Sequence, residues 1–167
     1  MQKLNSEYLE QLARKNVLAL DCAEHTGFYS IHEYGTWHFP ADGKAPKKLG
    51  EDYQQHKRFR DTIIDFVKKH DIKVIASEDV NVGKHFNALK KLSQFQGVLF
   101  ELCATLDIPL IVFNVREIKR WATGDGNASK EKMMEYAVKR WHIDPEGDDN
   151  VGDATHIFFH FCHRYKL

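Results

Sequence analysis

Hydrophobic residues gather in three short continuous runs that predict the strands of a buried sheet. Residues 17–22, 72–77 and 109–113 are almost entirely apolar, with polar residues only at their ends. Runs of this length and composition are typical of strands that are covered on both faces. Residues 28–34 and 36–39 instead alternate between apolar and polar positions. They predict two antiparallel strands that turn around Tyr34 and Gly35.

The remaining apolar residues recur at intervals of three and four, the spacing of amphipathic helices. In the helix predicted over residues 54–70, Phe59, Ile63, Phe66 and Val67 form one apolar face. The long helix after the second apolar run carries two apolar strips, more than one sheet face needs, which favours self-association. The spacing predicts helices over residues 5–15, 54–70, about 84–106, 115–121, 128–141 and 151–163.

The order of these elements predicts an α/β domain with a mixed five-stranded sheet flanked by helices. The chain has 167 residues, of which 43% are hydrophobic and 29% charged, a composition typical of one globular domain. No internal repeat or linker is visible in it. We therefore expect a helical N-terminal extension over residues 1–16 and one domain over residues 17–167.

Charge and cysteine content narrow the functional classes. The formal net charge is zero, but Lys and Arg outnumber Asp and Glu between residues 81 and 141, and residues 144–153 hold five acids without a Lys or Arg. A basic face around an acidic site suits a polyanionic ligand. The three dispersed cysteines indicate free thiols in a reducing compartment. With neither a signal peptide nor a membrane span in the sequence, we expect a cytoplasmic protein without a membrane partner.

Three acidic residues stand where strands end or a helix begins. Asp21 closes the first apolar run, Glu78 follows the second, and Asp153 stands just before the apolar, His-rich segment 155–163. A carboxylate at the end of a buried strand is costly to desolvate, and three together repel one another unless a cation neutralises them. Hard carboxylate oxygens favour Mg²⁺ or Mn²⁺. The simplest chemistry for this set is two-metal hydrolysis of a phosphodiester.

Five segments stand in order along the chain: Asp21–Gly27, Glu78–Val80, Gln94–Gly97, Ala122–Lys130 and Asp149–Ala154. Together they resemble the conserved segments of the RuvC-type Holliday junction resolvases, which belong to the RNase H-like superfamily. Asp21–Gly27 is similar to the first acidic strand and turn of that family, and Glu78–Val80 to its second acidic strand end. Gln94–Gly97 and Ala122–Lys130 resemble its helical Gln and Gly and its Thr-Gly-x-Gly-x-Ala-x-Lys segment. Asp149–Ala154 is similar to the C-terminal acidic motif in its phage-like form. Each segment alone is weak evidence for the resemblance, whereas the five segments in this order are specific to the family.

The resemblance implies an RNase H-like fold and an endonuclease that resolves four-way DNA junctions by paired symmetric nicks, leaving a 5′-phosphate and a 3′-hydroxyl. It implies two Mg²⁺ ions per site, with Mn²⁺ as a substitute. The implied catalytic and metal-binding residues are Asp21, Glu78, Asn150 and Asp153. Asn150 stands where family members carry Asp or His, so Asp149 is an alternative fourth ligand.

The implied DNA contacts lie along the basic part of the chain. Gly124 and Gly126 allow backbone N–H groups to approach a phosphate, and Lys130 follows them. A four-way junction is close to two-fold symmetric, so we expect a homodimer with two active sites. The predicted DNA-binding residues are Lys84, Lys90, Lys91, Arg116, Lys119, Arg120, Gly124, Gly126 and Lys130.

Two other functions remain open at this stage. The chain could be another RNase H-like nuclease that acts on RNA–DNA hybrids or branched DNA. It could also bind junctions without cutting them, which the uncharged Asn150 favours. A nucleotide-binding domain is disfavoured because the sequence has neither a P-loop nor a Rossmann glycine motif.

Overall fold

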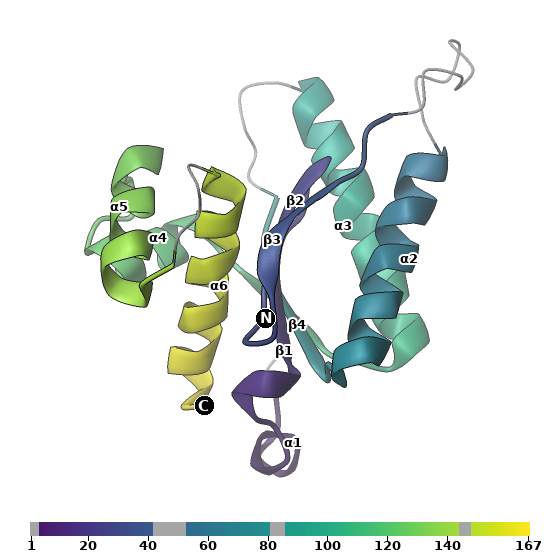
Figure 1. Cartoon of the computed structure of the whole chain (residues 1–167), viewed down its shortest axis with the longest axis horizontal. Helices are drawn as coiled ribbons and strands as arrows, with labels where there is room; N and C mark the ends of the chain where they lie inside the picture. The colour runs from purple at the N-terminus through teal and green to yellow at the C-terminus, as the bar shows by residue number, and fades with distance from the viewer. Residues whose placement is uncertain (1–3, 42–52, 81–85, 144–147) are drawn as a thin grey trace.

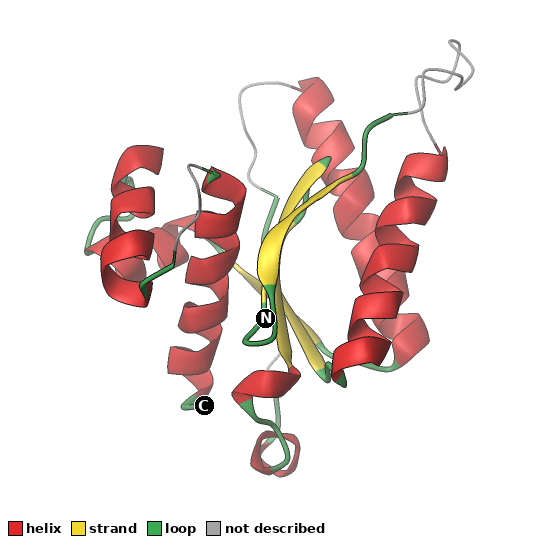
Figure 2. Ribbon diagram, in the orientation of Figure 1, coloured by secondary structure: helices red, strands yellow, loops and turns green. Residues whose placement is uncertain are grey.

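The computed structural model describes residues 4–41, 53–80, 86–143 and 148–167, and a five-stranded mixed sheet forms its centre (Figures 1 and 2). The strand order is β3-β2-β1-β4-β5. β1 pairs in parallel with β4, and β4 with β5, whereas β1, β2 and β3 form an antiparallel meander. The mixed five-stranded sheet predicted from the sequence is therefore confirmed. The strands are β1 Val17–Asp21, β2 His25–Tyr29, β3 Tyr34–His38, β4 Val74–Glu78 and β5 Leu110–Phe113.

Helices cover both faces of the sheet. α2 and α3 lie on one face and α6 on the other, with α4 and α5 outside α6 (Figure 1). No helix within the described ranges is long and apolar enough to cross a membrane. The helices are α1 Ser6–Glu10, a 3₁₀ turn Arg14–Asn16, α2 Tyr53–His70, α3 Phe86–Leu106, α4 Val115–Thr123, α5 Lys130–Trp141 and α6 Asp149–Tyr165.

The alternation of side chains along β1 explains its continuous apolar sequence. Val17 and Ala19 belong to the core on the α6 side, where Phe158 is also buried. Leu18 and Leu20 belong to the core on the α2–α3 side. Each strand residue is thus buried on one of two helix-covered faces, as expected for the central strand of an α/β sheet.

Two predicted local features are wrong. The hairpin turns at residues 30–33, and Gly35 lies inside β3 opposite Phe28. The Ser30 hydroxyl accepts hydrogen bonds from the backbone N–H groups of His32 and Glu33, at 3.1 and 3.2 Å, and so stabilises a turn that apolar alternation does not reveal. The N-terminal segment also forms a five-residue helix and a 3₁₀ turn, in place of one helix over residues 5–15.

The N-terminal segment packs against the end of the sheet. Leu12 is buried in the core on the α6 side, and the Tyr8 hydroxyl donates a hydrogen bond to the Lys73 carbonyl. The division into an extension over residues 1–16 and a domain over residues 17–167 stays a prediction. The described residues of the extension pack against the core of that domain.

The two apolar strips of α3 do not have the separate roles that the sequence predicts, one in the core and one in self-association. Phe95 and Leu102, from one strip, and Leu99 and Cys103, from the other, are all buried in the core on the α2–α3 side. The two strips therefore form one wide core-facing surface, because α3 packs against both the sheet and α2. The inference that one strip is surplus is wrong.

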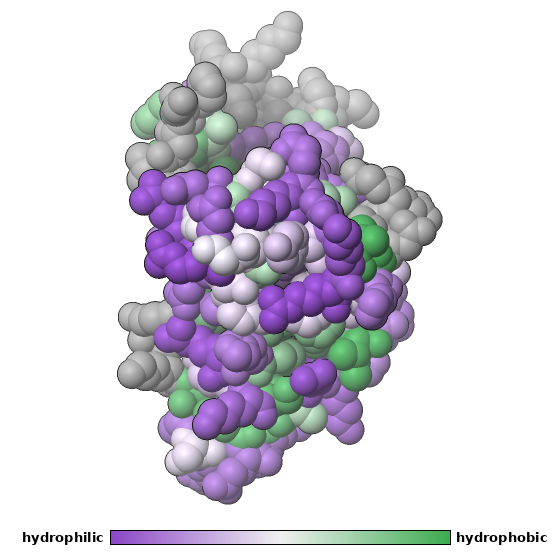
Figure 3. Space-filling view, turned by 90° about the vertical axis from the view of Figure 1, so that its left-hand side faces the viewer, coloured by the Kyte–Doolittle hydropathy of each residue, from purple (hydrophilic) through white to green (hydrophobic). Residues whose placement is uncertain are grey.

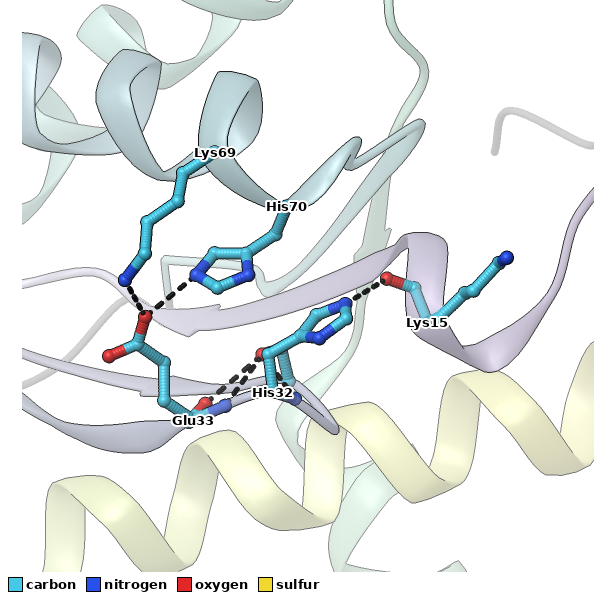
Figure 4. A network of polar contacts seen from close by, with 6 residues as sticks. Lys15, His32, Glu33, Lys69 and His70 are labelled. Atoms are coloured by element: carbon cyan, nitrogen blue, oxygen red, sulfur yellow. Dashed lines mark hydrogen bonds and ion pairs between the residues drawn. The ribbon is translucent and has the colours of Figure 1, made fainter.

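A polar network fixes the β2–β3 turn to α2 and to the 3₁₀ turn that precedes β1 (Figure 4). The Glu33 carboxylate accepts from Lys69 Nζ and pairs with His70 Nε2, at 2.8 and 2.7 Å. The His32 ring stacks on His70 with 4.6 Å between centroids and donates to the Lys15 carbonyl at 3.0 Å. Exposed pairs of this kind contribute little stability, so the network mainly positions the turn.

The first turn of α6 lies directly against β2 and β3. Asp148 caps the helix by accepting from the Asn150 backbone N–H at 2.9 Å, and it also accepts from the Thr36 hydroxyl at 2.6 Å. The Asn150 backbone occupies the space where a side chain on Gly27 would lie. A residue without a Cβ is therefore required at this position of β2.

We predict that Gly27→Ala destabilises the protein by roughly 1–3 kcal/mol, because the added methyl group overlaps the Asn150 carbonyl and displaces α6. Gly97→Ala is the matched control, because a Cβ there meets nothing within 4 Å. It should add about 0.5–1 kcal/mol through higher helix propensity. Urea denaturation of both variants measures the difference, and a Gly27→Ala protein as stable as the wild type would contradict the close approach.

Candidate active site

Two of the predicted carboxylates lie side by side at one edge of the sheet. Asp21 is the last residue of β1 and Glu78 is the last residue of β4. The parallel register pairs Leu20 with Ser77, so the next position along each strand carries one acid. Both residues are half-buried. The sheet register therefore brings together two acids that are far apart in sequence.

Asp153 reaches the same region from α6. It lies four residues into the helix and is half-buried, and α6 packs against β1 and β2. Its negative charge raises the pKa of both Asp21 and Glu78, which places the three carboxylates within electrostatic range of one another. The structure thus joins acids from two strands and one helix into an acidic cluster, which we define as Asp21, Glu78 and Asp153.

Desolvation and mutual repulsion both act on the acidic cluster. Burial, followed by the charge of Asp153, raises the pKa of Asp21 to about 7. Burial, followed by the charges of Asp21 and Asp153, raises the pKa of Glu78 to about 8. Burial also raises the pKa of Asp153 to about 6. Such shifts are typical of carboxylates grouped for a functional purpose, because a folded core gains nothing from them.

Two lysines partly compensate this charge. Lys130, at the start of α5, pairs with Asp149 and lowers the pKa values of Asp21 and Asp153. Lys119, on α4, donates to the Ala128 carbonyl at 2.7 Å and lowers the pKa values of Glu78 and Asp153. Neither lysine cancels the upward shifts. A cation of higher charge would be a stronger partner for the cluster.

The two candidates for a fourth acidic-site ligand, Asp149 and Asn150, have different surroundings in the structure. The Asn150 side-chain amide donates to Asp148 at 2.8 Å, which engages it in the helix cap. Asp149 is half-buried, and its charge raises the pKa values of Asp21 and Asp153. Asp149 is therefore electrostatically part of the site, whereas Asn150 supports the helix end that carries it.

The donor set of the acidic cluster suits a hard divalent cation. All of its donors are carboxylate oxygens in a partly desolvated position, which is the chemistry that Mg²⁺ and Mn²⁺ select. Among the described residues, no three His, Cys, Asp or Glu side chains converge closely enough to form a ready-made metal site. The three carboxylates are chemically suitable ligands, and their raised pKa values indicate that a cation would stabilise their charged forms.

The predicted DNA-binding lysines and arginines lie in several environments. Lys91 pairs with Glu24, and Lys119 lies beside the acidic cluster. Arg116 and Arg120 are exposed on α4, and Lys90 is exposed on α3. Lys84 lies outside the described residues. Their contacts with DNA stay a prediction, which Lys90, Arg116, Arg120 and Lys130 support by their exposure.

Both predicted phosphate-binding glycines have structural roles. Gly124 ends α4 in the left-handed conformation with φ of 82°, and its N–H donates to the Arg120 carbonyl at 2.9 Å. Gly126 is buried, and a Cβ on it would lie 3.2 Å from the Arg116 carbonyl oxygen. These roles account for both glycines without a ligand, so their predicted contact with phosphate rests on the resemblance alone.

Sequence reasoning missed one residue that shapes the site and assigned another a different role. Asp148, which it did not select, orients the start of α6 through Thr36. Lys119, predicted only to bind DNA, lies close enough to the acidic cluster to lower the pKa values of Glu78 and Asp153. Hydrogen bonds from Thr36 and Asn150 outweigh burial and hold the pKa of Asp148 below its usual value. Asp148 carries a visible N-cap signal, an acid directly before a helical run. No local signal distinguishes Lys119 from its neighbours, because only tertiary packing places it.

Comparison with known proteins identifies the family. The family model described as "Crossover junction endodeoxyribonuclease RuvC" matches residues 42–159. The chain belongs to the RuvC family. The RuvC protein of Bacteroides fragilis is 26% identical over 122 residues, which cover 72% of this chain and 65% of that protein. The Porphyromonas gingivalis RuvC protein is 32% identical over 125 residues, which cover 72% of this chain and 64% of that protein. The match thus spans slightly less than two thirds of these relatives.

Solved structures show the same fold. Thermus thermophilus RuvC in complex with a Holliday junction substrate superposes with a TM-score of 0.69 at 14% identity, covering 90% of this chain and 94% of that chain. The yeast mitochondrial Holliday junction resolvase superposes with a TM-score of 0.55 at 12% identity, covering 96% of this chain and 92% of that chain. The predicted RNase H-like fold of the RuvC type is therefore confirmed.

We predict that Asp21→Asn stabilises the metal-free protein at pH 8. Folding raises the pKa of Asp21 from its ordinary value near 4 to about 7, so this group lowers stability progressively as the pH rises across that interval. Removing the charge should add roughly 1–4 kcal/mol at pH 8 and little at pH 4. Urea denaturation in EDTA at both pH values measures the effect.

Asp65→Asn is the matched control for this experiment, because Asp65 is exposed on α2 and the substitution removes the same charge. It should change stability little at either pH. An Asp21→Asn protein that is less stable than the wild type at pH 8 would mean that the Asp21 carboxylate makes a favourable contact in the metal-free fold.

Proposed function

We propose that this RuvC-family chain is a metal-dependent endonuclease that resolves four-way DNA junctions by paired symmetric nicks. The acidic cluster carries the proposal, because three desolvated, mutually repelling carboxylates lie at the sheet edge of a chain that belongs to this family. Relatives carry the name crossover junction endodeoxyribonuclease, and one structural neighbour is complexed with a Holliday junction. The expected products have a 5′-phosphate and a 3′-hydroxyl.

The acidic cluster would hold two Mg²⁺ ions, or Mn²⁺ in their place. Asp21 is the central ligand, because it lies on the middle strand between Glu78 on β4 and Asp153 on α6. Asp149 supplies the fourth position in our proposal, in place of Asn150. When bound, such ions lower the pKa of a water molecule and stabilise charge on the reacting phosphate and leaving oxygen.

The remaining groups of the site position the acids and the DNA backbone. Asp148 and Thr36 fix the first turn of α6, and with it the direction of Asp149 and Asp153. Lys130 is exposed at the rim, and its pairing with Asp149 can be exchanged for a DNA phosphate once a metal neutralises the acid. Exposed cations on α3 and α4 would contact more distant phosphates, which predicts a salt-dependent affinity.

We also propose a homodimer, with one active site for each of two symmetric nicks. The apolar surface for it lies between α2 and α3, where Tyr53 and Gly97 line a groove of about 520 Å³. Tyr53 is 59% exposed in this groove, and Phe100, which does not line it, is 53% exposed on α3. This groove replaces the surplus helix strip as the proposed interface. We further keep the expectation of a cytoplasmic protein, consistent with Cys22, Cys103 and Cys162 as free thiols.

We predict Mg²⁺-dependent cleavage of a synthetic four-way junction by the full chain, at symmetric positions and not in a matched linear duplex. Asp21→Asn should lower the rate by roughly 100-fold or more, because metal stabilisation of a phosphoryl transition state is worth several kcal/mol. End-labelled junctions with Mg²⁺, Mn²⁺ or EDTA measure it, and Asp65→Asn is the control. Sedimentation under the same conditions should give twice the mass of one chain.

The alternatives have distinct outcomes in this assay. Preferential cleavage of an RNA–DNA hybrid would assign the chain to another RNase H-like activity. Tight junction binding without cleavage in any metal would indicate a non-cleaving junction-binding protein. A monomer that makes single unpaired nicks would contradict the proposed homodimer while leaving the nuclease assignment intact.

The fourth ligand is tested by comparing two neighbouring substitutions. Asp149→Asn should weaken Mn²⁺ binding at least tenfold, because it removes a charged oxygen donor from the cluster. Asn150→Ala should leave Mn²⁺ binding within about threefold, because the amide serves the Asp148 cap. Isothermal titration with Mn²⁺ distinguishes them. The reverse ranking would assign the fourth position to Asn150.

A further inference from the structure

A pocket away from the acidic cluster is lined by residues of α4, α5 and α6, the helices on the side of the molecule that faces the viewer in Figure 3. Its volume is about 600 Å³, within the range of small-molecule sites. Its α6 residues begin at Phe159 and include His163, six and ten positions after Asp153. That separation corresponds to roughly 9–15 Å along the helix axis. The pocket lining consists of Arg14, Trp121, Arg140, Trp141, Phe159, Cys162, His163, Lys166 and Leu167.

Stacked aromatic rings form one wall of this pocket. Trp141 lies parallel to Phe159, with 3.9 Å between ring centroids and 5° between planes. Trp121 lies nearly parallel to Trp141, at 5.6 Å and 12°. The Trp141 indole N–H donates to His156 at 3.3 Å, which fixes the ring. The three rings are half-buried, so each keeps part of its surface accessible. Because these rings already stack on one another, a planar ligand would extend the stack at the ring surface that remains accessible.

The charged residues of the pocket are all basic. The Arg140 guanidinium lies 4.8 Å from the Trp121 ring centre and 4.7 Å from that of Trp141. Arg14 donates from Nε and Nη2 to the Leu167 carbonyl, at 2.9 and 2.7 Å. Arg140 likewise donates to the Trp121 and Ala122 carbonyls, at 3.5 and 3.4 Å. In the described part of the chain, no Asp or Glu lines the pocket.

Arg140 is oriented without being neutralised, because carbonyl oxygens and ring faces carry no net negative charge. Arg14 bonds to Leu167, the last residue of the sequence, through Nε and Nη2, which leaves its Nη1 for a ligand. Lys166 and His163 are exposed beside the two arginines. The pocket is therefore an anion-attracting concavity with aromatic walls. A phosphate would meet the arginine donors, while a planar base would stack on the tryptophan and phenylalanine rings. A purely inorganic anion would leave the aromatic wall unused.

We infer that this pocket binds a nucleotide, with its base against the aromatic wall and its phosphate against Arg14 and Arg140. Two sources share this chemistry, a free nucleoside monophosphate and a nucleotide unit of single-stranded DNA. The inference does not depend on the proposed nuclease activity, since the pocket shares no residue with the acidic cluster. It gives this nuclease-like chain a second, non-cleaving contact for nucleic acid components.

The test is an NMR titration of the full chain in EDTA, so that no divalent metal links the result to the acidic cluster. The probes are thymidine monophosphate, thymidine, inorganic phosphate and a short 5′-phosphorylated oligothymidine. Thymidine monophosphate or the oligonucleotide should shift the indole N–H signals of Trp121 and Trp141, and leave Trp37 on β3 unchanged. Thymidine and phosphate should each bind at least tenfold more weakly.

Arg140→Gln should weaken binding of the better probe at least tenfold, and Arg14→Gln should do the same from a different element. Lys139→Gln is the matched control, because Lys139 pairs with Glu135 on the same helix and does not line the pocket. It should change the affinity less than twofold. Using two arginine variants keeps the test valid if one of them misfolds, which the NMR spectrum reports directly.

The outcomes are separable. Shifts with the monophosphate identify a free nucleotide as sufficient, and shifts with the oligonucleotide alone identify a DNA strand as the source. Equal binding of inorganic phosphate, no shift at Trp121 and Trp141, or equal losses in Lys139→Gln and Arg140→Gln would each overturn the inference. None of these results bears on junction cleavage, which is measured with a divalent metal present.

Discussion

The central constraint in this structure is the electrostatic cost of holding three carboxylates together at a partly buried sheet edge. Burial and mutual repulsion raise the pKa of Asp21 to about 7 and that of Glu78 to about 8. The fold tolerates this cost because β1 and β4 are covered on both faces by apolar helices. Because β1 and β4 pair in parallel and are tightly packed, their last residues, Asp21 and Glu78, are held next to each other. Stability generated elsewhere thus maintains an arrangement that is unfavourable by itself.

The docking of α6 completes this arrangement, and it depends on close contact rather than on charge. The missing side chain of Gly27 admits the Asn150 backbone, and Thr36 holds the capping residue Asp148. Asp148 and Asp153 are five residues apart and differ in function for a physical reason. Hydrogen bonds stabilise the charged form of Asp148, whereas burial disfavours the charged form of Asp153. Asp148 therefore stabilises the start of α6, whereas the charged form of Asp153 would be stabilised by a bound cation.

The described surface separates into regions of different chemistry around this core. The acidic cluster lies at one edge of the sheet, the apolar groove lies between α2 and α3, and the aromatic and basic pocket lies beside α6. The net charge of this protein is zero, so the distribution of charge over its surface decides whether it attracts a polyanion, which responds to the local field. A metal bound at the acidic cluster would reverse the sign of that edge and make it compatible with a DNA backbone.

The sequence by itself determined the strand and helix pattern, the mixed sheet and the acids at the strand ends. Local hydrophobic periodicity encodes these elements and their order along the chain, and the family resemblance then assigned a function to the acids. The β2–β3 turn escaped prediction because a Ser30 hydrogen bond outweighs apolar alternation. Tertiary structure alone decided that α3 buries residues of both of its apolar strips, that Asp149 lies near enough to raise the pKa values of Asp21 and Asp153, and that Lys119 lies near enough to lower that of Asp153. It also assembled Arg14, Trp121 and Arg140 into one pocket. Contacts between residues far apart in the chain depend on packing and register, which no local pattern encodes.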